Sequence, residues 1–383
     1  MKLFSCQRCD HVLFFENTVC TSCGTPCAYA VEAEALVAVP TGAAAEPFDV
    51  KLPSGKRAAY RKCKNDLEHD ACNWLVSIAD GVEHCRSCRL TGAVPDLSDA
   101  KCAAAWVDIE RAKRRLVYTL YRLGLPVISK AEDPSAGMQF DFRLGTPDEP
   151  VMTGHDEGLI TLNVSEADAA FRENMREKMG EGYRTVLGHL RHEIGHYYWD
   201  RLVRDKPPLA ACRTLFGDDQ QSYEKAIERH YSQGAPADWP QSFISEYATM
   251  HPWEDWAETW AHYLHMVDTL ETAKSHGLTV RTPGKKVGKK VATEALTFQN
   301  YESLSTSWQA VTLALNDLNR SMGVKDAYPF VVSPTVHGKL RFVHELVRDQ
   351  QSERARARPR PAAPVKANAA GWRRWLASGR ASA

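Results

Sequence analysis

The chain has 383 residues, which is long enough for two or three domains with at least one full hydrophobic core. Apolar residues (44%) and charged residues (25%) occur in ordinary globular proportions, and the 48 basic and 48 acidic side chains cancel. The zero net charge excludes a global attraction to nucleic acid or to anionic membranes, so any such contact must be local.

The first residues of the sequence, Met1 to Cys6, lack the apolar run of a secretory signal. No stretch reaches the roughly 18 consecutive apolar residues that cross a bilayer. We therefore expect a cytoplasmic protein without a membrane span. In a reducing compartment, closely spaced cysteines are metal ligands more often than disulfides.

Residues 1–27 contain two CxxC pairs, Cys6 with Cys9 and Cys20 with Cys23. Two such turns supply four thiolates for one tetrahedral zinc ion, so this segment predicts a structural zinc ribbon. Metal binding would supply most of the folding free energy of so small a unit. Redox activity of the CxxC pairs is the alternative, but no thioredoxin-like pattern surrounds them. Cys27 has no partner in this pattern.

An alanine-rich stretch, residues 28–55, predicts a linker or an irregular edge. Residues 56–97 then contain a second set of cysteines: Cys63, Cys72, Cys85 and Cys88. Only the last two form a CxxC pair, so His69 and His84 are alternative ligands, and Cys63 and Cys72 could be merely buried. We favour a second four-cysteine zinc site, which would also be structural because no position is left open for chemistry.

From residue 98 the apolar residues recur over long stretches at helical spacing, and we expect one domain over residues 98–350. Apolar residues recur at helical spacing from Ala103 to Leu123. Further elements are predicted as strands at 138–144 and 159–164, helices with short breaks over 165–278, and helices at 303–319 and near 337–348. The final segment, residues 351–383, has eight Lys and Arg against one Glu and predicts a basic disordered tail.

The sequence from Tyr183 to Leu202 contains an HExxH motif on an amphipathic helical pattern. His192 and His196 are four residues apart, so both imidazoles leave one face of the helix and can reach one ion. Glu193 lies one residue further round, where it can accept a proton from a metal-bound water. The motif is short enough to occur by chance, so a second element has to support it.

That second element is the stretch from His251 to His265, in which Glu254 and Glu258 are four residues apart on a predicted helix that begins at Pro252. A zinc ion held by two histidines needs a third protein ligand and leaves its fourth position to water. Glu254 can supply that ligand, and Glu258 can accept a hydrogen bond from the far nitrogen of a ligating histidine. The reverse assignment, with Glu258 on the metal, remains open at this point.

HExxH followed by a distant ExxxE resembles the gluzincin pattern of metallopeptidases. Tyr247 stands seven residues before Glu254, as does the tyrosine of the lethal-factor toxin and related zincins. With its opening FxCxxC ribbon and the later HEIGHYYWDRL, the chain resembles the bacterial family of zinc-binding metallopeptidases with N-terminal zinc ribbons. The resemblance implies an α+β fold: a mainly helical zincin-like metallopeptidase domain with a small sheet, preceded by one or two zinc ribbons.

The resemblance implies Zn²⁺ as cofactor, with one catalytic ion and one or two structural ions, and a peptide or protein as substrate. Glu193 would act as general base and Tyr247 would stabilise the oxyanion. The strand predicted at 159–164 would be an edge strand that pairs with extended substrate.

A rival interpretation is a zinc-ribbon adaptor that binds nucleic acid or protein and carries an inactive or DNA-associated zincin domain. The ribbons, the lysine-rich segment 283–290 and the basic tail suit weak contacts with nucleic-acid phosphates. The presence of the base Glu193 favours the enzyme.

Overall fold

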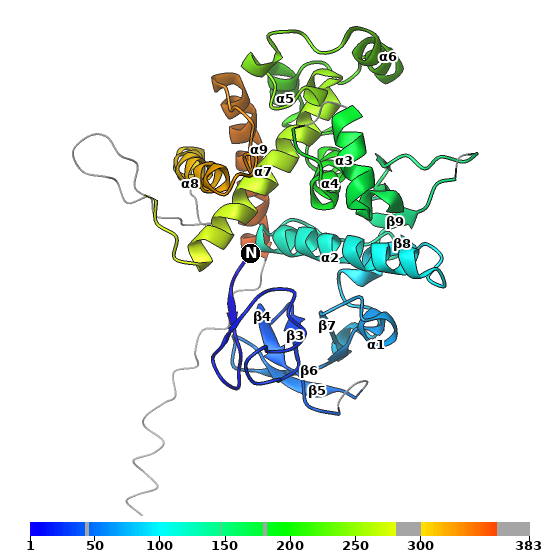
Figure 1. Cartoon of the computed structure of the whole chain (residues 1–383), viewed down its shortest axis with the longest axis vertical. Helices are drawn as coiled ribbons and strands as arrows, with labels where there is room; N and C mark the ends of the chain where they lie inside the picture. The colour runs from blue at the N-terminus through cyan, green and yellow to red at the C-terminus, as the bar shows by residue number, and fades with distance from the viewer. Residues whose placement is uncertain (43–45, 147, 179–181, 281–299, 358–383) are drawn as a thin grey trace, which may run out of the picture.

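The computed structural model describes residues 1–42, 46–146, 148–178, 182–280 and 300–357 (Figure 1). An N-terminal module of small sheets lies on one side of a long helix, α2 (Ala100–Arg122), and a larger, mainly helical domain lies on the other. This arrangement confirms the predicted α+β class, with a mainly helical domain that follows two four-cysteine sites.

The N-terminal module consists of three small antiparallel sheets. Its strands are β1 (Phe4–Ser5), β2 (Val12–Leu13), β3 (Cys27–Ala30), β4 (Ala35–Ala38), β5 (Phe48–Lys51), β6 (Arg57–Lys62) and β7 (Leu75–Ser77), with the short helix α1 (Lys64–His69) between the last two. A common core joins this module to α2. The ring centroid of Phe15 lies 4.9 Å from that of Tyr118 on α2, and within the module the centroids of Tyr29 and Trp74 are 5.1 Å apart.

The prediction of a linker over residues 28–55 is wrong. The described part of this stretch contains most of the β3–β4 hairpin and all of β5, and its small apolar residues enter a core with Tyr60 and Leu75. The Tyr29 amide also donates to the Asn73 carbonyl, which ties the hairpin to the second cysteine set. Alanine carries little pattern by itself, because its burial depends on the neighbours that only the folded chain supplies.

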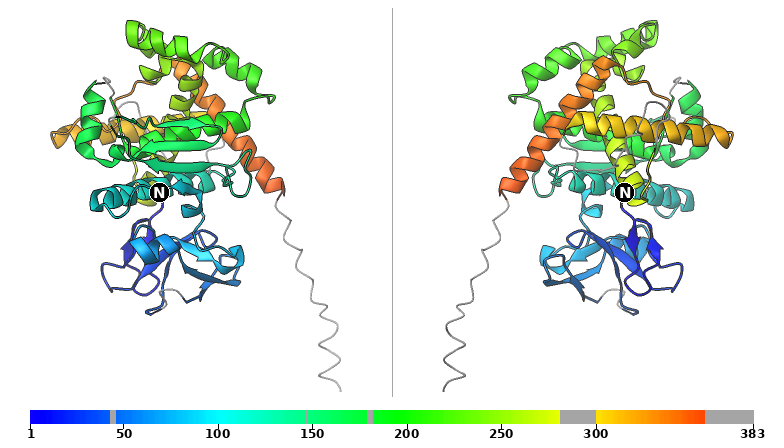
Figure 2. Two further views of the ribbon diagram at one scale, coloured as in Figure 1. Left: turned by 90° about the vertical axis from the view of Figure 1, so that its right-hand side faces the viewer. Right: turned by 90° about the vertical axis from the view of Figure 1, so that its left-hand side faces the viewer.

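The larger domain contains a four-stranded sheet in the order β10-β11-β9-β8. Its strands are β8 (Thr91–Ala93), β9 (Gln139–Arg143), β10 (Gly154–Asp156) and β11 (Leu159–Asn163). Figure 2 shows the N-terminal module on one side of α2 and the strands and helices of this domain on the other. The predicted strands at 138–144 and 159–164 are β9 and β11, which pair in parallel.

The prediction that 159–164 is an edge strand is wrong, because β11 lies between β9 and β10. The edge belongs to β10, which pairs antiparallel with β11. Its three residues, Gly-His-Asp, follow a turn-rich stretch and are too few to show any periodicity.

The remaining elements are helical: α3 (Ala169–Lys178), α4 (Val186–Leu202), α5 (Leu209–Phe216), α6 (Tyr223–Gln233), α7 (Pro252–Ser275), α8 (Tyr301–Ser321) and α9 (Pro334–Ala357). Helix α9 continues into the first residues of the predicted tail, whereas residues 358–383 and the lysine-rich segment 283–290 lie outside the described residues. Within the described ranges, no helix combines the length and apolarity that crossing a bilayer requires.

Helices α4 and α7 pack closely, and Gly195 makes this approach possible. A Cβ atom at Gly195 would lie 3.0 Å from the Ala257 Cα and 3.2 Å from the Trp260 Cβ. The Trp256 indole also donates to the Gly195 carbonyl at 2.8 Å. The two helices that carry the HExxH and ExxxE motifs are therefore held at backbone contact.

Replacing Gly195 by alanine is expected to lower the free energy of unfolding by about 1–3 kcal/mol, because the added methyl group overpacks this contact. Chemical denaturation followed by circular dichroism measures the loss. Gly154→Ala is the matched control, since nothing lies within 4 Å of a Cβ atom there. Equal stability of the two variants would contradict the close contact.

Candidate metal centres

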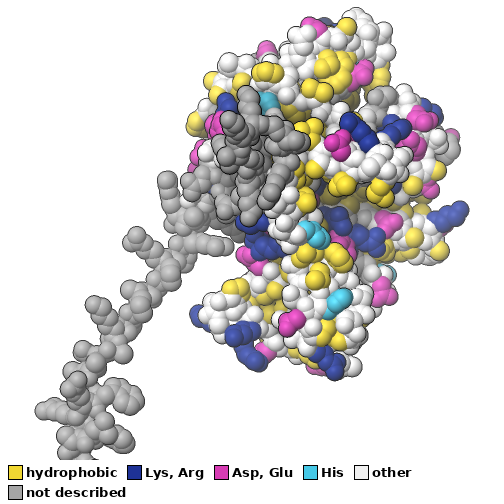
Figure 3. Space-filling model, turned by 60° about the vertical axis from the view of Figure 1, so that its left-hand side comes forward, with side chains coloured by type: hydrophobic (Ala, Val, Ile, Leu, Met, Phe, Trp, Pro, Cys, Tyr) yellow, Lys and Arg dark blue, Asp and Glu magenta, His cyan; other side chains and the backbone are white. Residues whose placement is uncertain are grey.

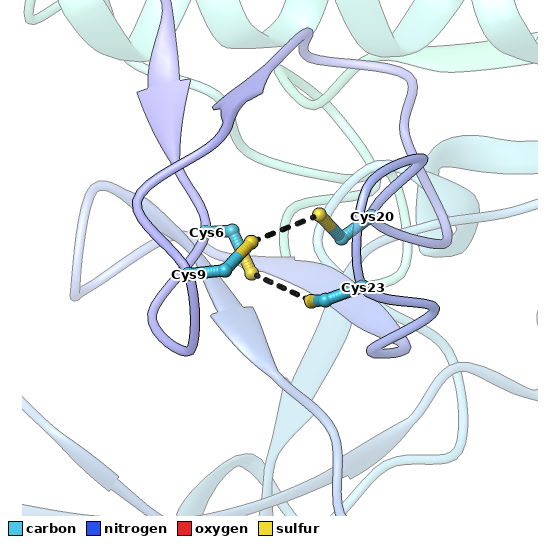
Figure 4. Close-up of side chains that lie close together, drawn as sticks. All are labelled: Cys6, Cys9, Cys20 and Cys23. Carbon is cyan, nitrogen blue, oxygen red and sulfur yellow. Dashed lines mark hydrogen bonds between the residues drawn. The ribbon is translucent and has the colours of Figure 1, made fainter.

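The first four-cysteine set converges on one point (Figure 4). The Sγ atoms of Cys6 and Cys23 lie 3.7 Å apart, as do those of Cys9 and Cys20. Four sulfurs arranged tetrahedrally at 2.3 Å from a zinc ion would be separated by about 3.8 Å, so the spacing fits this metal. Cys27 lies outside the set: its thiol contacts the Asn17 carbonyl, and burial raises its pKa to about 11.

The second set, Cys63, Cys72, Cys85 and Cys88, is also gathered and is completely buried. The Cys72 Sγ atom lies 3.6 Å from those of both Cys85 and Cys88. The alternative ligand His69 instead packs edge-on against Trp106, and neither it nor His84 belongs to the set.

This second site is built into the junction between the module and the larger domain. Residues Cys88–Leu90 form a 3₁₀ turn that leads directly into β8. The guanidinium of Arg114, on α2, donates to the Ala71 carbonyl at 2.5 Å. Burial lowers the pKa of Arg114, but the negative charges of Cys72 and Glu110 outweigh it and raise the pKa. A buried cation thus faces the thiolates.

The HExxH motif lies on α4, which begins after Thr185, whose hydroxyl accepts a hydrogen bond from the Gly188 amide. The Nε2 atoms of His192 and His196 are 3.2 Å apart. The helix is more buried than an amphipathic pattern predicts, because both α2 and α7 pack against it.

Helix α7 brings Glu254 to these histidines. Its first turn begins at Pro252 and is capped by His251, whose Nδ1 accepts from the Trp253 amide. Glu254 is 1% exposed, and its Oε2 atom lies 2.9 Å from the His192 Nε2 and 3.4 Å from the His196 Nε2. Nitrogen and oxygen ligands at about 2.0–2.1 Å from a tetrahedral zinc ion would be about 3.3 Å apart. The three donor atoms therefore fit a zinc ion with one open position.

Glu258 lies on the other side of His192. Its Oε1 atom is 2.6 Å from the His192 Nδ1, and its Oε2 atom accepts from the Ser245 hydroxyl at 2.7 Å. A histidine that uses Nε2 as a ligand carries its proton on Nδ1, so this is the position of a carboxylate that orients a metal-binding imidazole.

Two side chains at the centre are absent from the sequence prediction: Tyr223 and Ser245. Tyr223, at the start of α6, donates to the Glu254 Oε1 atom at 2.8 Å, so both oxygens of this carboxylate have a defined environment. Tyr223 lies 27 residues after His196 and 31 residues before Glu254, and Ser245 lies in an irregular loop. No motif or regular spacing in the sequence therefore points to either residue.

The charges at the centre are strongly coupled. Burial raises the pKa of Glu258, but the hydrogen bond and the charge of His192 outweigh it and lower that pKa to about 2. Burial also raises the pKa of Glu254, but the charges and hydrogen bonds of His196 and His192 outweigh it and hold that pKa well below its ordinary value. Both carboxylates are therefore ionised at neutral pH and ready to balance a cation.

Glu193 and Tyr247 border the same centre. Glu193 is 7% exposed, and burial raises the pKa of its carboxyl above the ordinary value. Tyr247 opens the 3₁₀ turn Tyr247–Thr249, and its ring centroid lies 5.9 Å from that of His192. Burial, followed by the charge of Glu254, raises the pKa of Tyr247, so its hydroxyl keeps its proton and can donate.

A cavity of about 400 Å³ adjoins the centre. Tyr223 and Trp253 line this cavity and also contact the ligand set. Tyr223 bonds Glu254, and the ring centroid of Trp253 lies 3.8 Å from that of His196. The ring of His155, on the edge strand β10, stacks on that of His196 with the centroids 6.1 Å apart. The cavity and the strand β10 thus both adjoin the ligand set at His196.

The residues on which the expectation of nucleic-acid contact depends lie mostly outside the described residues. On the face of the molecule in Figure 3, acidic and basic side chains are interspersed rather than segregated. This face offers no support for a phosphate-binding surface.

Comparison with known proteins agrees with this geometry. The chain matches a "zinc-ribbon domain" family over residues 3–99 and the family described as "Putative zinc-binding metallo-peptidase" over residues 102–346. It is 40% identical to the "Uncharacterized protein Rv2568c" of Mycobacterium tuberculosis and to the "Uncharacterized protein Mb2598c" of Mycobacterium bovis, over 91% of this chain and 95% of each relative. No solved structure matches it significantly. The predicted resemblance is confirmed: the chain belongs to this family of zinc-binding metallopeptidases and carries an N-terminal zinc ribbon.

Proposed function

We propose that this chain hydrolyses peptide bonds with a zinc ion held by His192, His196 and Glu254. The observation that carries the proposal is that these three side chains bring one donor atom each within hydrogen-bond distance of the others. Buried Glu193 lies next to His192 on α4. A bound zinc ion supplies Lewis acidity and lowers the pKa of its water to about 7.

The other residues of the centre have separate tasks in this proposal. Glu193 accepts the proton of the attacking water and passes it to the leaving amine, and its burial suits a group that must exchange protons near neutral pH. Tyr247 donates a hydrogen bond to the oxyanion that develops on the scissile carbonyl. Glu258 and Tyr223 hold the ligands His192 and Glu254 in place.

An extended substrate suits the surroundings of the centre. Strand β10 has one unpaired edge and lies against α4, so a peptide can add to the sheet there, with a side chain reaching the adjoining cavity. The two four-cysteine sites would hold structural zinc, which gives three ions per chain.

The direct test is cleavage of an unfolded protein such as β-casein by the zinc-loaded chain. The chelator 1,10-phenanthroline should stop cleavage, and added zinc should restore it. Mass spectrometry of the fragments identifies the residues on each side of the cut. Absence of cleavage by protein that contains three zinc ions per chain would contradict the proposal.

The two acids of α7 are expected to differ in their effect on zinc binding. Glu254→Ala should remove one zinc ion per chain, because it deletes a ligand. Glu258→Gln should retain the ion but bind it about 10–100-fold more weakly, because His192 loses the carboxylate that orients it. Competition with a chromophoric chelator measures both. The opposite order of effects would assign Glu258 as the ligand.

A further inference from the structure

The C-terminal helix α9 carries a buried lysine that contacts two segments of the catalytic centre at once. Lys339 is 2% exposed, and its Nζ atom lies 2.5 Å from the Asp255 Oδ2 atom and 2.6 Å from the Ser242 carbonyl. Asp255 is the direct neighbour of the proposed ligand Glu254. Ser242 belongs to the loop of residues 241–247, which ends at Tyr247.

A second contact, made by the residue directly before α9, reaches the same loop. The Ser333 hydroxyl donates to the Gln241 carbonyl at 2.8 Å. The ammonium of Lys339 also lies 4.4 Å from the ring centroid of Phe243, within the range of a cation–π contact. Figure 1 shows α9 beside α7, and the two helices contact each other.

The far end of this loop serves the centre directly. Ser245, three residues after Ser242, donates to Glu258, and its hydroxyl also accepts from the Ala248 amide at 3.2 Å. Tyr247 follows two residues later. Ala248 belongs to the 3₁₀ turn 247–249, so Ser245 is hydrogen-bonded to the turn that carries Tyr247.

The Lys339–Asp255 ion pair is buried, and a buried ion pair is by itself weak evidence of a stabilising role. Burying a lysine and an aspartate removes both from water, and well-packed apolar residues of similar volume give comparable stability. Apolar residues, however, cannot hydrogen-bond to the Ser242 carbonyl and to Asp255. Lys339 bonds to both and so links the loop to the first turn of α7.

We propose that Lys339 is a positioning residue, which holds the loop 241–247 so that Ser245 and Tyr247 face the centre. This inference rests on the proposed peptidase function. It makes α9 part of the active site although no residue of α9 is a predicted ligand, base or oxyanion donor.

The test uses the full chain with Lys339→Met combined with Asp255→Asn, so that no unpaired carboxylate is left buried. We expect kcat to fall about 10–100-fold with KM within threefold, because misplacing a catalytic group by about 1 Å costs this much. Hydrogen–deuterium exchange of amides 241–249 should rise about tenfold. Arg341→Met, which removes an exposed cation of α9 paired with Glu302, is the matched control and should change neither.

A background that lacks the two positioned groups, Ser245→Ala with Tyr247→Phe, separates positioning from general stability. There the Lys339 and Asp255 substitutions should lower kcat less than threefold. A drop as large as in the wild-type background, or unchanged kcat and exchange in the first comparison, would overturn the inference. If the wild-type chain cleaves no peptide, the proposed function fails, and the exchange of residues 241–249 alone decides whether Lys339 holds the loop.

Discussion

Replacing Glu193 by glutamine is expected to lower kcat for peptide hydrolysis by about 10²–10⁴-fold, the usual contribution of a positioned general base. Glutamine keeps the size of the side chain but cannot accept the proton. Zinc content should stay at the wild-type value, because the donor atoms of His192, His196 and Glu254 are untouched. Steady-state kinetics and metal analysis on the same preparation measure both quantities.

The exposed Glu228 of α6 offers a control for this substitution, since Glu228→Gln is the same chemical change at a residue without a proposed role. It should retain full activity. A Glu193→Gln variant that loses zinc would place the glutamate in the metal site rather than beside it. A variant that keeps wild-type kcat would remove the proposed mechanism altogether.

Replacing Cys72 by serine is expected to prevent stable folding of more than the N-terminal module. Cys72 contacts two of the other three cysteines of its set, so its loss should release the second zinc ion. Structural zinc contributes on the order of 10 kcal/mol to folding in small domains, which is comparable to the total stability of most proteins. Because β8 and α2 adjoin this site, the damage should extend into the domain that carries α4.

Thermal unfolding followed by circular dichroism, together with zinc content, measures this effect. Cys102→Ser is the matched control: Cys102 lies on the same helix, α2, and in neither set of cysteines. It should retain three zinc ions and the wild-type melting temperature. A Cys72→Ser protein that melts as the wild type does would show that the second set is not a structural metal site.

Spacing alone predicted much of the centre, for a simple reason. Residues four apart on a helix share a face, so the positions of His192 with His196, and of Glu254 with Glu258, follow from helix geometry. The same reasoning could not choose between Glu254 and Glu258, since both acids share that face. The choice depends on the crossing of α4 and α7, in which Glu254 meets the two Nε2 atoms and Glu258 meets the His192 Nδ1.

Other parts of the centre had no local signal. Tyr223, Ser245 and Lys339 come from three separate segments, and each acts through a contact with a residue at least 13 positions away. The edge strand β10 and the β3–β4 hairpin escaped prediction because they are too short or too rich in alanine for a periodic pattern. Their roles depend on the elements that pack beside them.

The sequence by itself determined the family, the α+β class, the two sets of cysteines and the pair of motifs that meet at the centre. All of these depend on residue type and local spacing. The tertiary structure alone decided which carboxylate faces the histidines, which strand lies at the edge beside β11 and which buried groups contact the loop 241–247. These are distances between segments far apart in the chain, and the packing of α4, α7 and α9 determines them.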